Sequence, residues 1–557
     1  MIIDLARYTG EDVRCDLCII GAGAAGITIA REFLNGIHRV CLLESGGLEY
    51  EAQIQDLYDG ENTGLPYYDL ISSRLRYFGG TTNHWNGRCA PLDSIDFKKR
   101  SWVPYSGWPM SKQDLDPYYL RAQKICGLGE FVYDNRAWKQ LNIDSPPPVF
   151  DENKVDLKFF QFSDPVVRFG QVFRDELAGA KNIDIYLHAT VTNIQTNREG
   201  NQVEHLKIAS LDGSRTEVSA KLYVLACGGI ENPRLLLLSN KVRPAGVGNS
   251  NDLVGRFFME HPKGESGDVI SDDKYLLLDW FQKHYPNTTV PHWPSLCASE
   301  SQQEKLGLLN SSASIYYTPR LGTSGAELVD LYESIKDDED VEGWGRKIWA
   351  VVTDLDELVK AGYRRYVEGK KPIVDPGRVY LWCRCEQAPN PDSRIQLSRD
   401  KDALGQNRVE LNWQLSLIDR QTLLGLTRTI GEEFGRLGLG RVKLEDWTMD
   451  DSAEWKDLHG GRHHMGTTRM SDDPKSGVVN GDCRVHECNN LYVAGSSVFT
   501  TGGWANPTLT IVALALRMSE HLKGRLDKAA KLEVKTMAHL LASNGKNTPF
   551  TATNKIV

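Results

Sequence analysis

The order of apolar and polar positions near the N-terminus predicts a strand, a glycine-rich turn, a helix and a second strand. CDLCII, which begins at Cys15, is a short apolar run of the kind that forms a buried strand, and ITIAREFLNG carries apolar residues at the helical spacing of about 3.6 positions. A second apolar run, RVCLLES, follows and includes Glu44 at its polar end. This order is typical of a βαβ unit, in which the helix connects two parallel strands.

The pattern changes between about residues 260 and 450, where aromatic and charged segments replace the glycine-punctuated strands. This change predicts a second domain inserted into the first, and within it residues 322–371 are predicted to form a charged amphipathic helix. Strand and helix signals return after residue 459, with VHECNNLYVAGSSVF as a predicted strand and PTLTIVALALRMSEHLKG as a closing helix. Residues 523–557 are polar, so we expect one amphipathic helix there, followed by a disordered end.

Length and charge exclude several classes of protein. A chain of 557 residues exceeds what one core usually supports, and its 41% apolar and 25% charged residues are ordinary for a globular protein. With 65 basic and 74 acidic residues the net charge is -9, which gives no electrostatic footprint for binding nucleic acid or an anionic membrane. The best apolar candidate, residues 509–516, is far shorter than the ~18 residues that span a bilayer.

The N-terminus and the cysteines predict a cytoplasmic protein without a metal site. MIIDLARYTGEDVRCDLCII has neither the basic region nor the isolated apolar stretch of an export signal. The 11 cysteines are odd in number and scattered, unlike a secreted disulfide framework. Three close pairs lack companion pairs at zinc-ribbon spacing: Cys15 with Cys18, Cys383 with Cys385, and Cys483 with Cys488.

The glycine-rich turn GAGAAG at residues 21–26 matches the dinucleotide-binding pattern GxGxxG. Gly21 permits the tight bend, Gly23 lets the backbone approach a pyrophosphate, and Gly26 lets helix and strand pack closely. The pyrophosphate is then expected at the helix N-terminus, where free N–H groups and the macrodipole favour negative charge. Glu44, 18 residues after Gly26, is placed to accept hydrogen bonds from an adenosine ribose. The strand before the turn, the helix after it and Glu44 make a simple tight turn the weaker interpretation. They do not distinguish an NAD site from an FAD site.

Four further segments carry a family resemblance. RYFGGTTNHWNGRCAPLD, which begins at Arg76, is similar to the flavin-contacting loop of the glucose-methanol-choline (GMC) oxidoreductases. LVGRFFMEHP at residues 253–262, HHMGTTRM at 463–470 and NPTLT at 506–510 resemble three more motifs of that family. Together with the dinucleotide turn they follow the expected order over residues 15–522, so the resemblance covers nearly the whole chain.

Within the family, the GGxxxHW pattern and the NPTLT ending resemble the pyranose oxidase branch, with the bacterial glucoside 3-dehydrogenases and C-glycoside 3-oxidases. The resemblance implies an α/β fold, in which an FAD-binding, doubly wound (Rossmann-like) domain holds an inserted α+β substrate-binding domain. The FAD-binding domain is expected in three parts. The expected bounds are 1–100, 156–260 and 456–522 for those parts, 101–155 for a connecting or substrate-side segment, 261–455 for the substrate-binding domain and 523–557 for a C-terminal tail.

The activity implied by the resemblance is FAD-dependent oxidation of a secondary hydroxyl of a sugar or glycoside, at C3 or C2. Oxygen, a quinone or a redox protein is the implied electron acceptor, and neither a nucleic acid nor a membrane is expected as a partner. A non-sugar alcohol, such as a sterol, a choline-like or an aryl alcohol, is the alternative substrate. A non-catalytic flavin-binding protein is the alternative outside the enzymes.

The resemblance also assigns the residues of the reaction. His463 matches the family's base, since an imidazole with a pKa of ~6.5 can take up a proton near neutral pH. Asn506 matches its partner and offers a donor and an acceptor to the substrate hydroxyl. Adjacent side chains of an extended segment point to opposite faces, so His464 is expected to pack rather than to reach the substrate. A packing role for His463 and a turn role for Asn506 stay open as alternatives.

The same resemblance gives the cofactor contacts. In pyranose oxidase the histidine that matches His84 is bonded covalently to the flavin, and a hydrogen bond to non-covalent FAD is the open alternative. Trp85 is as well placed to pack its loop as to touch the substrate. The expected contacts are Gly21, Gly23, Ala24, Ala25, Gly26, Glu44, Ser45, Gly79, Gly80, Thr81, Asn83, His84, Trp85, Val191, Ala226, Gly228, Gly495, Ser496, Pro507 and Thr508.

Overall fold

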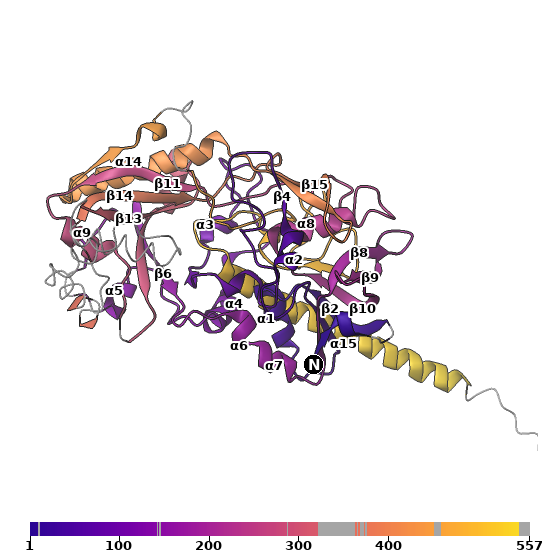
Figure 1. Ribbon diagram of the computed structural model, residues 1–557. Helices are drawn as coiled ribbons and strands as arrows, with labels where there is room; N and C mark the ends of the chain where they lie inside the picture. The colour runs from indigo at the N-terminus through magenta and orange to yellow at the C-terminus, as the bar shows by residue number, and fades with distance from the viewer. Residues whose placement is uncertain are drawn as a thin grey trace, which may run out of the picture.

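Two large β-sheets lie side by side in the computed structural model of the chain (Figure 1). The chain passes between the two sheets several times, so neither is built from one continuous stretch of sequence. The structure describes residues 1–8, 10, 12–141, 143, 146–286, 288–320, 363–364, 366–367, 373, 376–449 and 458–544.

The first sheet contains the predicted βαβ unit. Strands β2 and β3 pair in parallel, with helix α1 (Ala24–Glu32) between them in the chain. Residues 17–20 and 40–43 are buried throughout, as central strands of a parallel sheet are. The predicted α/β fold class is confirmed. The strands run in the order β1 (Ile2–Asp4), β7 (Ile183–Leu187), β3 (Val40–Leu43), β2 (Val13–Ile20), β10 (Arg215–Leu225), β9 (Val203–Ala209) and β8 (Thr190–Thr196), and β18 (Leu491–Val493) pairs with β10.

Helices α1 and α8 (Gly228–Leu238) contact strands of the first sheet, and α15 (Thr508–Asn544) packs against α1. Helix α15 also packs against α4 (Lys112–Ile125), and α8 packs against β8. Shorter helices fill the connections. They are η1 (Leu5–Arg7), α2 (Ala52–Gln55), η2 (Asp56–Tyr58), η3 (Gly80–Asn83), α3 (Ser94–Phe97), α5 (Ala137–Gln140), α6 (Phe169–Val172), α7 (Arg174–Ala178), α9 (Lys274–Phe281), α10 (Glu300–Leu306), η4 (Asp446–Thr448) and η5 (Ser496–Val498).

The second sheet is antiparallel and has helix α14 (Leu417–Leu437) packed against it. Ser416 and Asp419 form a capping box at the start of α14, and Gly438, with a φ of 68°, ends it. Leu423, Leu426 and related side chains of α14 form a core with the sheet. The strand order is β17 (Arg441–Leu444), β11 (Lys263–Ile270), β14 (Pro376–Cys385), β13 (Ser311–Pro319), β12 (His292–Ala298), β6 (Val155–Phe162) and β5 (Arg88–Cys89).

A small third sheet joins distant parts of the chain. It pairs β15 (Arg394–Lys401) with β16 (Asn407–Asn412), and β16 with β4 (Gly60–Asn62). Helix α8 packs against β15, so this sheet lies beside the first one.

The sheets divide the chain differently from the expected domain bounds. Strands β5 and β6 pair in the second sheet, although the expected bounds place residues 88–89 and 156–162 in the FAD-binding domain. The reason lies in the alternation of β6: its side chains Val155, Leu157 and Phe159 enter the core of the second sheet. The chain therefore enters the second sheet directly after the predicted flavin loop.

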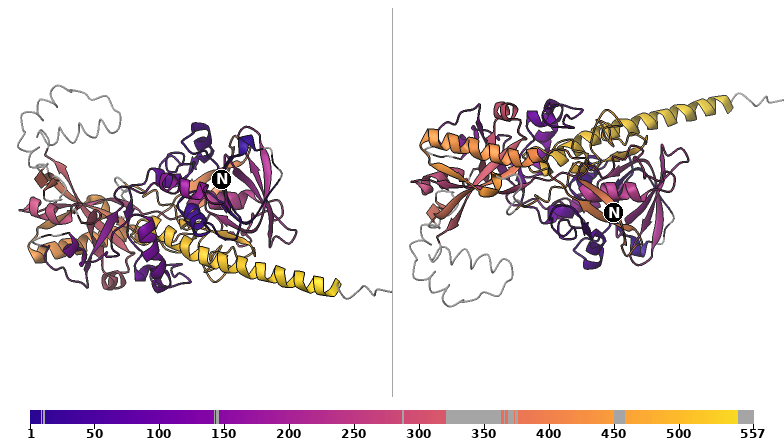
Figure 2. Two further views of the ribbon diagram at one scale, coloured as in Figure 1. Left: turned by 90° about the horizontal axis from the view of Figure 1, so that it is seen from below. Right: turned by 90° about the horizontal axis from the view of Figure 1, so that it is seen from above.

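Helix α15 also differs from its prediction, because the closing helix and the helix of the tail form a single element of 37 residues. Gly524 lies inside this helix without ending it. Figure 2 shows the far part of α15 projecting away from the rest of the molecule. The predicted helix at residues 322–371, apart from 363–364 and 366–367, and the predicted disordered end after residue 544 lie outside the described residues.

None of the helices within the described ranges is long and apolar enough to cross a membrane. The cytoplasmic location stays a prediction.

Candidate active site

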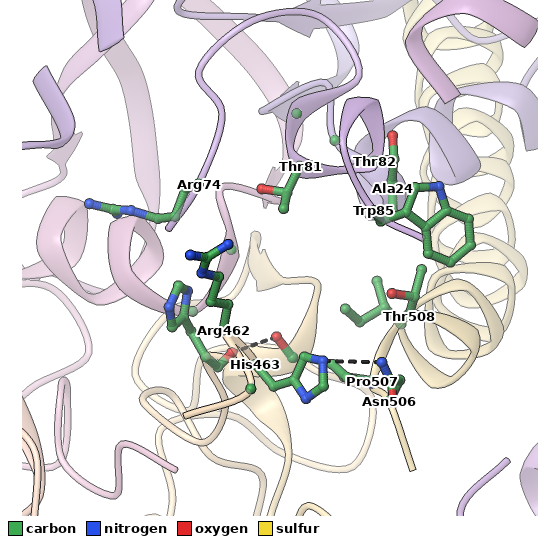
Figure 3. Close-up of a pocket in the computed structure, with 18 of the residues that line it drawn as sticks. Ala24, Arg74, Thr81, Thr82, Trp85, Arg462, His463, Asn506, Pro507 and Thr508 are labelled. Carbon is green, nitrogen blue, oxygen red and sulfur yellow. Dashed lines mark hydrogen bonds between the residues drawn. The ribbon is translucent and has the colours of Figure 1, made fainter. Parts of the chain in front are cut away.

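A cavity of about 630 Å³ is lined by residues from both large sheets and from the loops between them. Most of the predicted site residues meet on its wall, part of which is drawn in Figure 3. They are His463, Asn506, Gly21, Gly23, Ala24, Ala25, Glu44, Gly80, Thr81, His84, Trp85, Ala226, Gly228, Gly495, Ser496, Pro507 and Thr508.

Five predicted cofactor contacts do not line the cavity: Gly26, Ser45, Gly79, Asn83 and Val191. The Asn83 amide donates to the Phe78 carbonyl at 2.9 Å, and the Ser45 hydroxyl lies 2.6 Å from that of Thr190. The side chains of Asn83 and Ser45 therefore bond to neighbouring protein groups.

The turn at residues 21–26 has the shape of a cradle for a large ligand. A Cβ on Gly26 would lie 1.9 Å from the Gly21 carbonyl oxygen, and one on Gly21 would lie 2.7 Å from the Ala226 oxygen, so neither position accepts a side chain. At Gly23, Gly228 and Gly495 a Cβ would meet nothing within 4 Å, because these positions border the cavity. Helix α1 begins at Ala24, where its free N–H groups suit a pyrophosphate. The residues present therefore fit FAD.

Glu44 holds the two loops of this cradle together. One carboxylate oxygen accepts a hydrogen bond from the Ala22 N–H at 3.0 Å, and the other accepts one from the Gly46 N–H at 3.0 Å. Burial raises the pKa of this carboxyl, and the two N–H donors oppose the rise. The predicted ribose contact of Glu44 stays a prediction, since each oxygen keeps a second lone pair for another donor.

Trp85 is anchored in its loop. Its indole N–H donates to the Val167 carbonyl at 2.9 Å, and its ring meets Phe169 edge to face. The neighbouring His84 is exposed and lines the same cavity. Its covalent attachment to a flavin stays a prediction.

His463 lies between a second histidine and Asn506. Its Nδ1 is 2.7 Å from Nδ1 of His261. Its Nε2 is 3.2 Å from the Asn506 amide nitrogen, a contact drawn in Figure 3. The Asn506 amide oxygen accepts a hydrogen bond from Arg384 at 2.8 Å, which fixes the amide with its nitrogen toward His463. Nε2 of His261 lies 2.7 Å from the Gly503 carbonyl.

These contacts determine the tautomers of both rings. The Gly503 carbonyl can only accept, so Nε2 of His261 carries the proton and its Nδ1 is an acceptor. The proton of the Nδ1 pair then belongs to His463, which leaves Nε2 of His463 with a lone pair toward the cavity. The chain is thereby built to present an unprotonated nitrogen beside Asn506.

The electrostatic surroundings keep both rings neutral. Burial, His261 and Arg384 hold the pKa of His463 well below its ordinary value. Burial and then Arg384 lower the pKa of His261 to about 3. A neutral imidazole at position 463 is therefore available as a proton acceptor across the neutral pH range.

His464 faces a different set of partners. Its Nε2 lies 3.0 Å from the Tyr67 hydroxyl, which in turn donates to Glu260. Glu260 also accepts hydrogen bonds from the backbone N–H groups of Gly461 at 2.7 Å and His463 at 2.9 Å. The Tyr67–Glu260 pair therefore fixes the backbone at Gly461 and His463.

Sequence reasoning missed His261, Lys263 and Arg384 as site residues. His261 lies inside the MEHP motif, whose likeness to the family was seen without a role for the histidine. Lys263 follows that motif directly at the start of β11, and Arg384 lies on β14, where the sequence has no local motif. The left-handed φ of 56° at Arg462 also marks the turn before His463, because non-glycine residues rarely adopt it.

Comparisons with known proteins find relatives of this chain. Residues 389–515 match the family model described as GMC oxidoreductase. The chain is similar to a 2-methyl-1,2-propanediol dehydrogenase of Mycolicibacterium austroafricanum, with 26% identity over 92% of this chain and 95% of that protein. It is also similar to a C-glycoside 3-oxidase of Microbacterium trichothecenolyticum, with 24% identity over 86% of this chain and 79% of that protein.

Among solved structures, a formate oxidase superposes with a TM-score of 0.54 at 16% identity, over 93% of this chain and 99% of that one, which supports the fold. The motifs, the cradle and these matches confirm the predicted resemblance to the FAD-dependent GMC oxidoreductases, whose family model matches residues 389–515.

Proposed function

We propose that this enzyme oxidises a secondary hydroxyl of a sugar or glycoside, at C3 or C2, to a ketone, with His463 as the base. The observation that carries the proposal is the pairing of the His463 Nε2 lone pair with the Asn506 amide on the wall of the cavity. The pair lies beside Pro507 and Thr508, which are predicted flavin contacts. A substrate hydroxyl bound between the two side chains has an acceptor for its proton and a donor for its oxygen.

The reaction removes a proton from oxygen and a hydride from carbon. Bound FAD supplies the hydride acceptor. The hydroxyl proton passes to Nε2 of His463, and the C–H electron pair leaves with the hydride, so the C–O bond becomes C=O. The Asn506 N–H and the newly cationic His463 both stabilise the negative charge that develops on the oxygen. His261 accepts the hydrogen bond from the other side of the His463 ring and keeps the ring oriented.

The residues proposed to hold FAD come from two parts of the cavity. The turn at 21–25 and the start of α1 would bind the pyrophosphate, and Glu44 fixes the backbone of that turn. Gly495, Ser496, Pro507 and Thr508 would lie against the flavin ring. Oxygen, a quinone or a redox protein completes the cycle as electron acceptor.

A sugar substrate is supported by the aromatic face of the second sheet. Trp293, Tyr316 and Trp382 stand on adjacent strands and line the cavity, and they offer apolar ring faces to the C–H groups of a sugar. Relatives named C-glycoside 3-oxidase and fructose dehydrogenase support the same class. The relative named 2-methyl-1,2-propanediol dehydrogenase favours a small non-sugar alcohol as the second candidate.

Anaerobic reduction of the flavin tests the proposal. The FAD-loaded enzyme is mixed with glycosides, with free sugars, and with propane-1,2-diol and other simple alcohols, and the loss of the flavin absorbance is recorded. We expect a glycoside or sugar to bleach the flavin faster than any simple alcohol at equal concentration. Faster bleaching by the simple alcohols would replace the proposal with the second candidate, and no bleaching by any alcohol would refute an alcohol oxidoreductase.

A further inference from the structure

Three cationic side chains stand on the cavity-lining face of the second sheet. They are Arg88 of β5, Lys263 of β11 and Arg384 of β14. Arg88 is only 6% exposed and Arg384 only 9%. Lys263 and Arg384 are direct partners in the antiparallel register, an arrangement in which like charges destabilise a sheet. The protein therefore places positive charges together at a cost.

None of these three cations forms an ion pair within the described part of the chain. The Nε and Nη2 atoms of Arg88 are buried without a hydrogen-bond acceptor. Its guanidinium carbon lies 3.7 Å from the centre of the Phe160 ring and 4.9 Å from that of Trp293, so its immediate neighbours are aromatic. The guanidinium of Arg384 lies 5.1 Å from the same Phe160 ring, and its one hydrogen bond goes to the neutral amide of Asn506.

Two buried arginines elsewhere in this chain, Arg100 and Arg234, have carboxylate partners. Both terminal nitrogens of Arg100 bind Glu386, at 2.8 and 2.9 Å, and Arg234 binds Asp402 at 2.7 Å. A buried cation without such a partner is costly, because burial removes its hydration and no carboxylate compensates its charge. The contrast between Arg88 and Arg100 points to a counter-charge that arrives with a ligand.

The repulsion among these cations also lowers the pKa values of Lys263 and Arg88. Burial and then Arg384 lower the pKa of Lys263 to about 8, although Glu260 opposes this change. Burial and then Arg384 lower the pKa of Arg88 as well. An anion in the cavity relieves this repulsion and favours the charged forms.

We propose that the substrate is an anionic sugar or glycoside, whose carboxylate, sulfate or phosphate group is held by Arg88, Lys263 and Arg384. This inference rests on the proposed function and adds the charge of the substrate to it. Arginine side chains suit oxyanions, and their aromatic neighbours strengthen the attraction by excluding water. Because Arg384 also fixes Asn506, the anionic group binds on the same side of the cavity as the hydroxyl that reacts.

The test compares matched substrates on the FAD-loaded enzyme under anaerobic conditions. The glycoside set contains methyl glucuronide, its uncharged methyl ester, methyl glucoside, and the 6-sulfate and 6-phosphate of methyl glucoside. A non-sugar pair, lactate and propane-1,2-diol, separates charge from sugar chemistry. We expect the half-saturating concentration of the best anionic glycoside to be about 10- to 100-fold lower than that of its neutral counterpart, the range for charge-assisted hydrogen bonds. The sulfate, phosphate and carboxylate arms identify which oxyanion fits.

Variants assign the preference to the cluster. The preference is the half-saturating concentration of the neutral glycoside divided by that of the anionic one. Arg88→Gln is expected to reduce this ratio at least tenfold, and Arg88→Lys is expected to retain part of it. The control Lys305→Gln, at an exposed position on α10, is expected to leave the ratio unchanged. An unchanged ratio in Arg88→Gln overturns the assignment. An equal loss with both substrates, together with a lower flavin midpoint potential, would mean that the cations serve the reduced flavin, which also overturns it.

The outcomes separate this inference from the proposed function. Equal reduction by charged and neutral glycosides refutes the anionic substrate and leaves glycoside oxidation standing. Reduction by lactate and by no glycoside refutes glycoside oxidation and keeps the preference for an anion.

Discussion

Replacing His261 tests whether the proton on the His463 ring is held in place by its neighbour. His261 touches His463 and Gly503 and lies behind the base, so it is a positioning residue. His261→Phe keeps an aromatic ring of similar shape but removes the nitrogen that accepts from Nδ1 of His463. That N–H then has no acceptor, and the ring is free to turn or to take the other tautomer, in which Nε2 carries the proton.

The size of the effect follows from one lost hydrogen bond. An unsatisfied buried donor costs about 1 to 3 kcal/mol. If the whole cost appears in the transition state, the limiting rate of flavin reduction falls roughly 5- to 150-fold, at about 1.4 kcal/mol for each factor of ten. His261→Gln offers an amide oxygen in place of the ring nitrogen, so we expect it to recover part of the rate.

The assay is anaerobic stopped-flow reduction of the FAD-loaded variants over a range of substrate concentrations. A positioning role predicts a lower limiting rate with an unchanged half-saturating concentration and unchanged FAD content, and better rates in His261→Gln than in His261→Phe. His292→Phe is the matched control, because His292 is a buried histidine of the second sheet that does not line the cavity. Equal rates in wild type and His261→Phe, or an equal loss in His292→Phe, would refute the reasoning.

Three further predictions follow from the site. Glu44→Gln should weaken FAD binding by about 1 to 3 kcal/mol in reconstitution titrations, because one backbone N–H loses its charged acceptor. The control Glu49→Gln, at an exposed position, should leave FAD binding unchanged. Equal FAD affinities of Glu44→Gln and wild type would contradict this prediction. The rate of flavin reduction should fall at low pH, where His463 becomes protonated, and Lys263→Met should move this fall to higher pH. The reason is that Lys263 lowers the pKa of His463, so removing this cation raises that pKa. A fall at the same or a lower pH would contradict this prediction. Acid precipitation should release FAD from the polypeptide unless it is bonded to His84, in which case the peptide containing His84 carries its mass.

The parts of the site that the sequence predicted are those encoded in short local motifs. The turn at 21–26 and the His463 segment combine close spacing with fixed backbone shape, so their residues are visible without a structure. Both meet at the cavity as expected.

The cationic residues of the site, which the sequence analysis did not identify, are brought together by pairing between strands that lie far apart in the chain. The register of β11 with β14 places Lys263 beside Arg384, and the register of β5 with β6 places Arg88 over the aromatic face. Nothing local in the sequence specifies these partners, because a strand pattern fixes which face a side chain occupies but not which strand lies next to it. The same limit applies to β6, because the sequence does not specify that it pairs with β12 and β5.

The function of Glu44 shows a different limit. Its position directly after β3 predicts a ribose contact, which stays a prediction, and the structure adds a second role, because its two oxygens accept hydrogen bonds from the backbone N–H groups of Ala22 and Gly46. Spacing along the chain identifies a carboxylate at the right place, but it does not show that backbone N–H groups also bind its oxygens in the folded protein.

The most direct test of the central claim compares the two neighbouring histidines in single-turnover reduction of bound FAD. His463→Ala, His464→Ala and wild type are loaded with FAD, checked for equal flavin content, and mixed anaerobically with a substrate that reduces the wild type. With His463 as the base, we expect His463→Ala to reduce its flavin roughly 10²- to 10⁴-fold more slowly, and His464→Ala to be affected mainly through the lost contact with Tyr67. Reduction at the wild-type rate in His463→Ala would contradict the claim, whether or not His464→Ala is slowed.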